Sequence, residues 1–242
     1  MNNKSTLSII ISLSISLANN SMDERPKKRI CLESYRYEYK KFKEAIDTGN
    51  LELMEKLIQE GVDPNCMIEY LSDSRFAYFN TGDMPALHYS ILNDCDSKVI
   101  ELLLKYVTDI NITDDNHRNA LFCAVEKGNL IIAHLLIKQG IDFNLKDNKG
   151  DTCLCKSYYR FVFNQNGIKE IRSLNIIHLL IYSGADINIK DSDDYSFLDL
   201  AKRSWDGRIL AIILDWKNSI TKGIRTYMPA DLGNIVIKYV TG

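Results

Sequence analysis

The sequence predicts an all-α solenoid of about five stacked helix-turn-helix units, with hairpin loops between the units and a C-terminal capping helix. Three observations lead to this fold class. Four units end in a similar short segment, each such segment follows an apolar helix, and large apolar residues recur at a regular spacing where the units begin. The four similar ends are "GVDPN" (61–65), "TDIN" (108–111), "GIDFN" (140–144) and "GADIN" (184–188).

The apolar helices come directly before these ends. We expect them at "LELMEKLIQE" (51–60), "KVIELLLKYV" (98–107), "NLIIAHLLIKQ" (129–139) and "LNIIHLLIYS" (174–183). Apolar side chains cover most of the circumference of the third of these helices, so it must be buried between neighbours. A unit of this kind cannot close a core alone, and its stability must come from stacking along one dimension.

The starts of the units give the period. Leu87, Leu121 and Leu154 are separated by 34 and 33 residues, and Leu198 follows 44 residues later. Phe42 takes the same position in the first unit, 45 residues before Leu87. The period is therefore 33, interrupted by two insertions of about eleven residues.

Both insertions are rich in aromatic residues. They are "CMIEYLSDSRFAYFNTGD" (66–83) and "SYYRFVFNQNGIKEIRS" (157–173), and the first contains Tyr78 and Phe79. We expect both to form long loops. Such loops on a rigid scaffold serve as contact surfaces, and local packing of the rings against a flank of the solenoid is the alternative.

The pattern resembles the ankyrin repeat, whose family sequence runs G-x-T-P-L-H-x-A, then G-N, then L-L-x-x-G-A-D-x-N. The resemblance covers about residues 36 to 216. His88 alone keeps the family histidine, and Thr152 is the only clean family threonine. The resemblance implies a protein-binding array that uses its concave face and its hairpin tips. Together with Tyr78 and Phe79, the predicted partner-binding residues at the tips are Asn116, His117, Arg118, Asn148, Lys149, Asp193, Asp194 and Tyr195.

Composition excludes several classes of protein. Hydrophobic residues make up 45% of the chain and charged residues 26%, as in ordinary folded proteins. The net charge of -2 argues against a general nucleic-acid or membrane-surface binder. No CxxC pair occurs among the six cysteines, which are expected to be reduced thiols in a reducing compartment.

No catalytic motif is present in the sequence. It contains no phosphate loop, no HExxH zinc helix, no GxSxG elbow and no dinucleotide glycine fingerprint. The four histidines lack metal-ligand spacing, and His88 and His134 are interpreted as core residues. The clusters "NITDDNHRN" and "NIKDSDDYS" lack EF-hand spacing and suit hairpin turns. We therefore expect no enzyme, no cofactor and no metal.

Residues 1–35 form an N-terminal extension that is either signal-like or disordered. Residues 1–18 satisfy the pattern of a secretory signal peptide, which would make the protein secreted. The alternative is that Met22 is the natural start of an intracellular protein. The run "RPKKR" has the form of a nuclear-import motif, so host cytoplasm and nucleus are the expected compartments in that case.

The C-terminal region, 217–242, ends in an apolar pattern unlike the repeats. Its apolar residues follow the spacing of one helix face, and Pro229 suits the first position of that helix. The segment "MPADLGNIVIKYV" resembles the start of the F-box-like motif of poxvirus ankyrin proteins, the PRANC region, although the chain lacks the later helices of an F-box. In that family the motif docks the Skp adaptor of a cullin ubiquitin ligase. The matching residues are Pro229, Leu232, Ile235, Val236 and Tyr239.

Two functions fit these patterns. The first is a viral ankyrin adaptor that brings a host protein to the ubiquitin machinery. The second is a stoichiometric inhibitor that sequesters its target, as I-kappa-B-like ankyrin proteins do. In both cases the protein binds another protein and performs no chemistry of its own.

Overall fold

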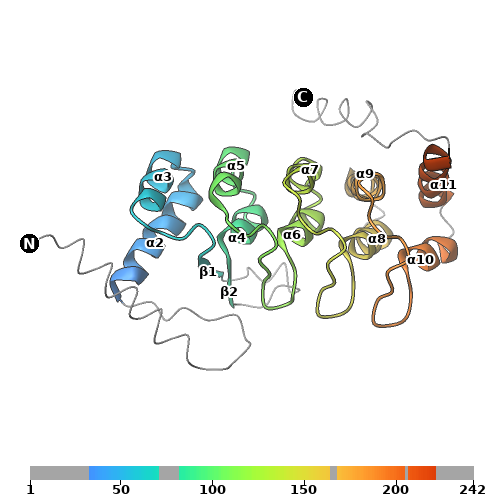
Figure 1. Cartoon of the computed structure of the whole chain (residues 1–242), viewed down its shortest axis with the longest axis horizontal. Coiled ribbons are helices and arrows are strands. Elements are labelled where there is room, and N and C mark those ends of the chain that lie inside the picture. Colours follow the sequence, from blue (N-terminus) through green and yellow to red (C-terminus); the bar gives the residue numbers. More distant parts are fainter. Residues whose placement is uncertain (1–32, 71–81, 164–167, 205–206, 222–242) are drawn as a thin grey trace, which may run out of the picture. The chain divides into compact units, whose positions relative to one another are not determined.

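The computed structural model describes residues 33–70, 82–163, 168–204 and 207–221. The chain divides into the units Met1–Arg36 and Tyr37–Gly242, and the fold described here is that of the second. Its described part contains ten helices and one two-stranded sheet (Figure 1). The helices form five successive pairs: α2 (Glu33–Thr48) with α3 (Leu51–Gln59), α4 (Ala86–Leu92) with α5 (Ser97–Tyr106), α6 (Ala120–Lys127) with α7 (Leu130–Lys138), α8 (Cys153–Phe163) with α9 (Ile168–Tyr182), and α10 (Phe197–Arg203) with α11 (Gly207–Thr221).

The pairs stack in chain order. Among the first helices of the pairs, α4 contacts α6, α6 contacts α8, and α8 contacts α10. Among the second helices, α3 contacts α5, α7 contacts α9, and α9 contacts α11. Successive pairs therefore build two adjoining layers of helices, which confirms the predicted all-α repeat solenoid with five units (Figure 1).

Equivalent residues of successive units fill the core between the layers. A buried leucine lies six residues after the start of the second helix in the first three units, at Leu57, Leu103 and Leu136. Its equivalent in the fourth unit is Leu180, which lies twelve residues after the start of the longer helix α9. The predicted anchors of the first helices are buried in the first four units: Phe42, Leu87, Leu121 and Leu154. The fifth unit differs, because Phe197 is fully buried there while Leu198 is only partly buried.

The recurrent Asp-x-Asn ends link the first four units of the array to one another. In each of the first four units the aspartate accepts a hydrogen bond from the backbone N–H of the asparagine two residues later, as Asp142 does from Asn144 at 2.8 Å. In the first three units the asparagine side chain also bonds to the following unit. Asn111 Oδ1 accepts from the N–H of Asp142 at 2.7 Å, and Asn144 Oδ1 accepts from the N–H of Asp186 at 2.9 Å. The Asp-x-Asn segment therefore contributes hydrogen bonds to the stacking of the units.

The first insertion contains a pair of strands. β1 (Met67–Tyr70) pairs antiparallel with β2 (Gly82–Pro85), and Met67 lies opposite Pro85. Ile68 and Met84 lie opposite each other in this ladder, and both are buried. The ends of the predicted loop are thus ordered strands, and residues 71–81 between them lie outside the described residues.

The second insertion does not form the predicted long loop. It lengthens the fourth pair of helices instead, because α8 continues to Phe163 and α9 already begins at Ile168. Tyr158 and Phe161 are spaced like one face of a helix, and both are buried. The prediction of a loop is wrong because the spacing of these aromatic residues lets them bury on one face of a longer α8. Phe163, by contrast, is 81% exposed.

Three further findings bear on the predictions. Five cysteines of the described residues are free thiols, and burial raises the pKa of the Cys95 thiol to about 11. In the same part of the chain, no helix combines the length and apolar character needed to cross a membrane. The predicted capping helix from Pro229 lies outside the described residues, as does the N-terminal segment up to residue 32.

Candidate protein-binding surface

One aspartate organises each of three hairpins between units. Asp114 Oδ1 accepts hydrogen bonds from the N–H groups of Asn116 at 2.9 Å and Arg118 at 3.0 Å. Asp147 Oδ1 and Asp191 Oδ1 accept from the N–H groups two and four residues later in the same way, all at 2.9 Å. A side-chain carboxylate thus replaces the backbone acceptor that a tight turn lacks.

Each of these turns also needs a left-handed residue. His117, Gly150 and Asp194 occupy the third position after the organising aspartate, with φ of 57°, 76° and 65°. The prediction that the Asp/Asn clusters form hairpin turns is confirmed at these positions. The three organising aspartates could be predicted from the repeat, since Asp114, Asp147 and Asp191 have the same spacing as the starts of the units.

Direct contacts hold successive hairpins against each other. Asn148 donates its backbone N–H to the Asn116 carbonyl at 3.0 Å, and its side-chain amide donates to Asn116 Oδ1 at 3.2 Å. A Cβ added to Gly150 would lie 2.8 Å from the backbone nitrogen of Ser192 in the next hairpin. The three hairpins therefore form a contiguous, hydrogen-bonded edge of the molecule (Figure 1).

Ionic contacts stiffen the middle of this edge. The Lys156 ammonium lies 2.6 Å from Asp151 Oδ2 and 3.1 Å from Asp147 Oδ2. Burial lowers the pKa of Lys156, but hydrogen bonds and the charges of the two carboxylates outweigh it and raise that pKa overall. Burial raises the pKa of Asp151 despite Lys156. Lys156 therefore stays positive at neutral pH and offsets part of the negative charge of the two carboxylates beneath the hairpins.

The structure places most of the predicted tip residues at the surface. His117 and the pair Asn148 and Lys149 are exposed on the first two of these hairpins. On the third, Asp194 pairs with Lys190 at 2.8 Å, and the Arg203 guanidinium lies 4.6 Å from the ring centroid of Tyr195. Sequence reasoning missed Arg203, because this contact joins a hairpin to a helix outside it. The exposed tip residues on the three hairpins are His117, Asn148, Lys149, Asp193, Asp194 and Tyr195.

Arg118 has a different environment. Its side chain is only 12% exposed, and its guanidinium donates two hydrogen bonds to Asp114 Oδ2 at 3.0 and 2.6 Å. Its carbonyl lies 2.9 Å from His88 Nε2, and neutral His88 donates to it. Arg118 therefore braces the first hairpin against α4, and Asn116, also partly buried, is engaged by Asn148.

The remaining predicted residues lie outside the described part of the chain. These are Tyr78 and Phe79 of the first insertion and Pro229, Leu232, Ile235, Val236 and Tyr239 of the C-terminal segment. Within the described residues, no group of three or more His, Cys, Asp or Glu side chains is arranged to hold a metal ion. The described surface offers hydrogen-bonding groups and charges of both signs on a rigid edge.

Comparison with known proteins agrees with this geometry. The family model for ankyrin repeats (3 copies) matches residues 42–147 and again residues 87–191. The two matches together span more than half of the chain. No curated protein matches the sequence. The chain belongs to the ankyrin-repeat family, whose members are generally non-enzymatic modules for binding other proteins.

Proposed function

We propose that the protein is a viral adaptor that holds a host protein on its hairpin edge and presents it to a Skp–cullin ubiquitin ligase. The binding of a host protein is supported by the structure of the hairpin edge. Its exposed side chains, from His117 to Tyr195, sit on turns that are hydrogen-bonded within and between units. Little ordering entropy is then lost when a partner binds, which favours affinity and specificity.

The mixture of charges on this edge favours a partner of complementary pattern and disfavours a uniformly charged one. Lys149 carries a positive charge on one hairpin, while Asp193 and Asp194 carry negative charges on the next. Paired patches of opposite sign select a partner mainly by rejecting like charges. Such a surface suits a folded protein with its own mixed charges.

The link to the ligase rests on the F-box-like pattern of Leu232, Ile235 and their neighbours. We place the complex in the host cytoplasm, with access to the nucleus through "RPKKR" (25–29). The competing function is sequestration without a ligase. It is favoured by the hairpin edge itself, which needs no additional segment to hold a target in a one-to-one complex.

A pull-down from host cells with two sets of variants separates these functions. Lys149→Glu with Asp193→Lys reverses charges at the tips and should remove the host target while retaining the Skp adaptor. Leu232→Asp with Ile235→Asp should remove the adaptor and retain the target. Asn234→Asp with Thr241→Asp, on the opposite side of the expected helix, is the matched control and should retain both.

The outcomes are distinct. If the unmodified protein brings down a host target but no Skp adaptor, the ligase link is wrong and sequestration stands. If the tip variant retains its target, the hairpin edge is not the binding surface. A thermal melt of each variant shows whether a lost interaction reflects a lost fold.

A further inference from the structure

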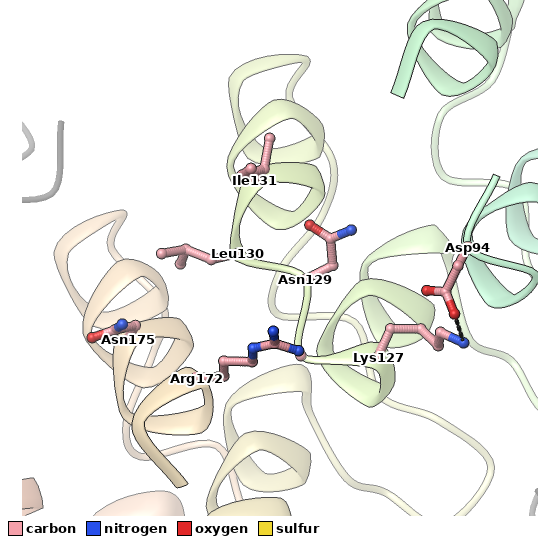
Figure 2. Close-up of a pocket in the computed structure, with 8 residues that line it drawn as sticks. Asp94, Lys127, Asn129, Leu130, Ile131, Arg172 and Asn175 are labelled. Atoms are coloured by element: carbon pink, nitrogen blue, oxygen red, sulfur yellow. Dashed lines mark ion pairs between the residues drawn. The ribbon is translucent and has the colours of Figure 1, made fainter. Parts of the chain in front are cut away.

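A second candidate surface lies at the turns within the units. A groove of about 250 Å³ opens between the α6–α7 turn and the first half of α9 (Figure 2). Its apolar wall comes from Leu130 and Ile131 at the start of α7. The polar lining residues are Asp94, Lys127, Asn129, Arg172 and Asn175.

One arginine, Arg172, lines the groove, and a second, Arg160, lies beside the same turn. The Arg172 side chain points from α9 toward the α6–α7 turn (Figure 2). Arg160 of α8 lies against the same turn, since a Cβ added to Gly128 would be 3.1 Å from Arg160 Nη2 and 3.6 Å from Arg172 Cβ. A glycine at position 128 therefore lets the Arg160 side chain approach the turn closely, whereas Arg172 Cβ is at an ordinary contact distance. The φ of 68° at Gly128 also suits a residue without a Cβ.

The acidic groups nearby offset only part of this positive charge. Lys127 forms an ion pair with Asp94 and donates to the Leu92 carbonyl at 2.8 Å, so these two charges cancel. Glu126 is the acidic group that acts on Arg160. Burial lowers the pKa of Arg160, and the charge of Arg172 lowers it further, against the effect of Glu126. Arg172 forms no ion pair with any residue of the described ranges.

Both arginines belong to the second insertion, residues 157–173. The insertion lengthens α8 and α9, and this added length carries the two guanidinium groups beside the short turn of the preceding unit. On the other side of the lengthened pair, Arg208 of α11 pairs with Glu170. Glu170 is therefore paired with Arg208. The insertion thus creates a groove with surplus positive charge that a unit of 33 residues would lack.

We propose that this groove binds an acidic segment of a partner protein, with a carboxylate of that segment received by Arg172. Guanidinium groups bind carboxylates in a planar, two-bonded geometry. Leu130 and Ile131 would contact the aliphatic part of the same segment, and Asn129 and Asn175 supply amide groups beside it. The groove is built from turns within units and is separate from the hairpin edge, so this proposal does not depend on the ligase adaptor.

Charge and size favour an acidic protein segment over a nucleic acid. Nucleic-acid binders neutralise several phosphates along a strand, whereas one arginine lines this groove, which has room for one or two side chains.

The test is an NMR titration of the full-length, ¹⁵N-labelled protein with the peptide acetyl-EELEEL-amide. The peptide acetyl-QQLQQL-amide serves as the uncharged probe, and a short single-stranded RNA serves as the phosphate probe. We expect the acidic peptide to shift the amide signals of Gly128, Asn129 and Ile131, and the uncharged peptide to leave them in place. Arg172→Gln should weaken binding about tenfold, and Arg172→Glu should abolish it.

Arg172 is exposed, so both variants should keep the fold, as a thermal melt will show. Lys98→Gln, which removes an exposed cation from α5, is the matched control and should leave the affinity unchanged. Equal binding of the two peptides, unchanged binding by Arg172→Glu, or tighter binding of the RNA at these amides would each overturn the proposal. So would the lack of any shift at about 5 mM peptide, a concentration that detects even millimolar affinity.

Discussion

At the scale of single residues, the start of α4 differs from the starts of the later units. Thr152 Oγ1 accepts from the N–H of Cys155 at 3.3 Å, and Ser196 forms a capping box with Asp199. Pro85 occupies the same position before α4 and forms no side-chain cap. The residue three positions later is His88, whose buried Nδ1 has no hydrogen-bond partner among the described residues. Pro85 therefore occupies the position from which a hydroxyl side chain could donate a hydrogen bond to His88 Nδ1.

His88 makes the stability of the protein depend on pH. Burial lowers its pKa to about 4, below the 6.5 of an unfolded histidine, although the Arg118 carbonyl and Asp114 act in the opposite direction. Between these values the unfolded chain binds a proton that the folded chain does not, so stability is lost as pH falls from 6.5 toward 4. We expect a loss of roughly 3 kcal/mol across this window, measured by urea unfolding.

The matched variants isolate this effect. His88→Gln keeps a donor for the Arg118 carbonyl but cannot titrate, so its stability should fall less over the same window. His117→Asn, at an exposed left-handed position that asparagine tolerates, should retain the full pH dependence of the natural sequence. Identical pH profiles for the natural sequence and His88→Gln would contradict the assignment.

At the scale of elements, the hairpins act as connectors between units. The Asp-x-Asn ends carry hydrogen bonds across three successive units, from Asn111 to Asp142 and from Asn144 to Asp186. Asn188 ends the last such segment, and its side chain bonds within its own turn, to Asp186 Oδ1 at 3.1 Å. The same residue type therefore has two roles that its position along the stack decides.

Asn144→Ala should lower the free energy of unfolding by about 1 kcal/mol, because the Asp186 N–H loses its acceptor in the neighbouring unit. Asn188→Ala removes a contact within one turn and should cost less. Chemical denaturation of both variants gives the comparison. Equal losses would show that the asparagines act only inside their own turns and contribute nothing to stacking.

At the scale of the whole molecule, stability is distributed along the stack. Leu57 and Leu136 occupy equivalent buried positions, in the first and third units respectively. α7 belongs to a unit with described neighbours on both sides, whereas α3 belongs to the first described pair. In a linear array each unit is stabilised mainly by its neighbours, so the same lost side chain should have different consequences at these two positions.

Leu136→Ala should lower the free energy of unfolding by about 2–5 kcal/mol and reduce amide protection in the units on both sides. Leu57→Ala should reduce protection mainly in α2 and α3 and leave α6 to α9 protected. Native-state hydrogen exchange resolves this difference unit by unit. If Leu57→Ala reduces protection equally in all five pairs, the array unfolds as a single cooperative block.

Much of the array is predictable from sequence, because its determinants are local and repeated. The period of 33 locates the units, and the buried leucines at 57, 103, 136 and 180 follow from helical spacing. Exposure of Lys149 and Asp193 follows from their place in turns. The organising role of Asp114 and its two equivalents is encoded in the same repeat, but recognising it requires the geometry of the turn.

The sequence by itself determined the family, the number of units and the hairpin positions, because each depends on residues within about one repeat length. Only the tertiary structure decided the form of the second insertion, whose aromatic residues Tyr158 and Phe161 pack as helix. It also placed Arg160 and Arg172 beside Gly128, and Arg203 over Tyr195. These contacts join residues from different units or elements, and their formation depends on how neighbouring helices stack, which no local pattern specifies.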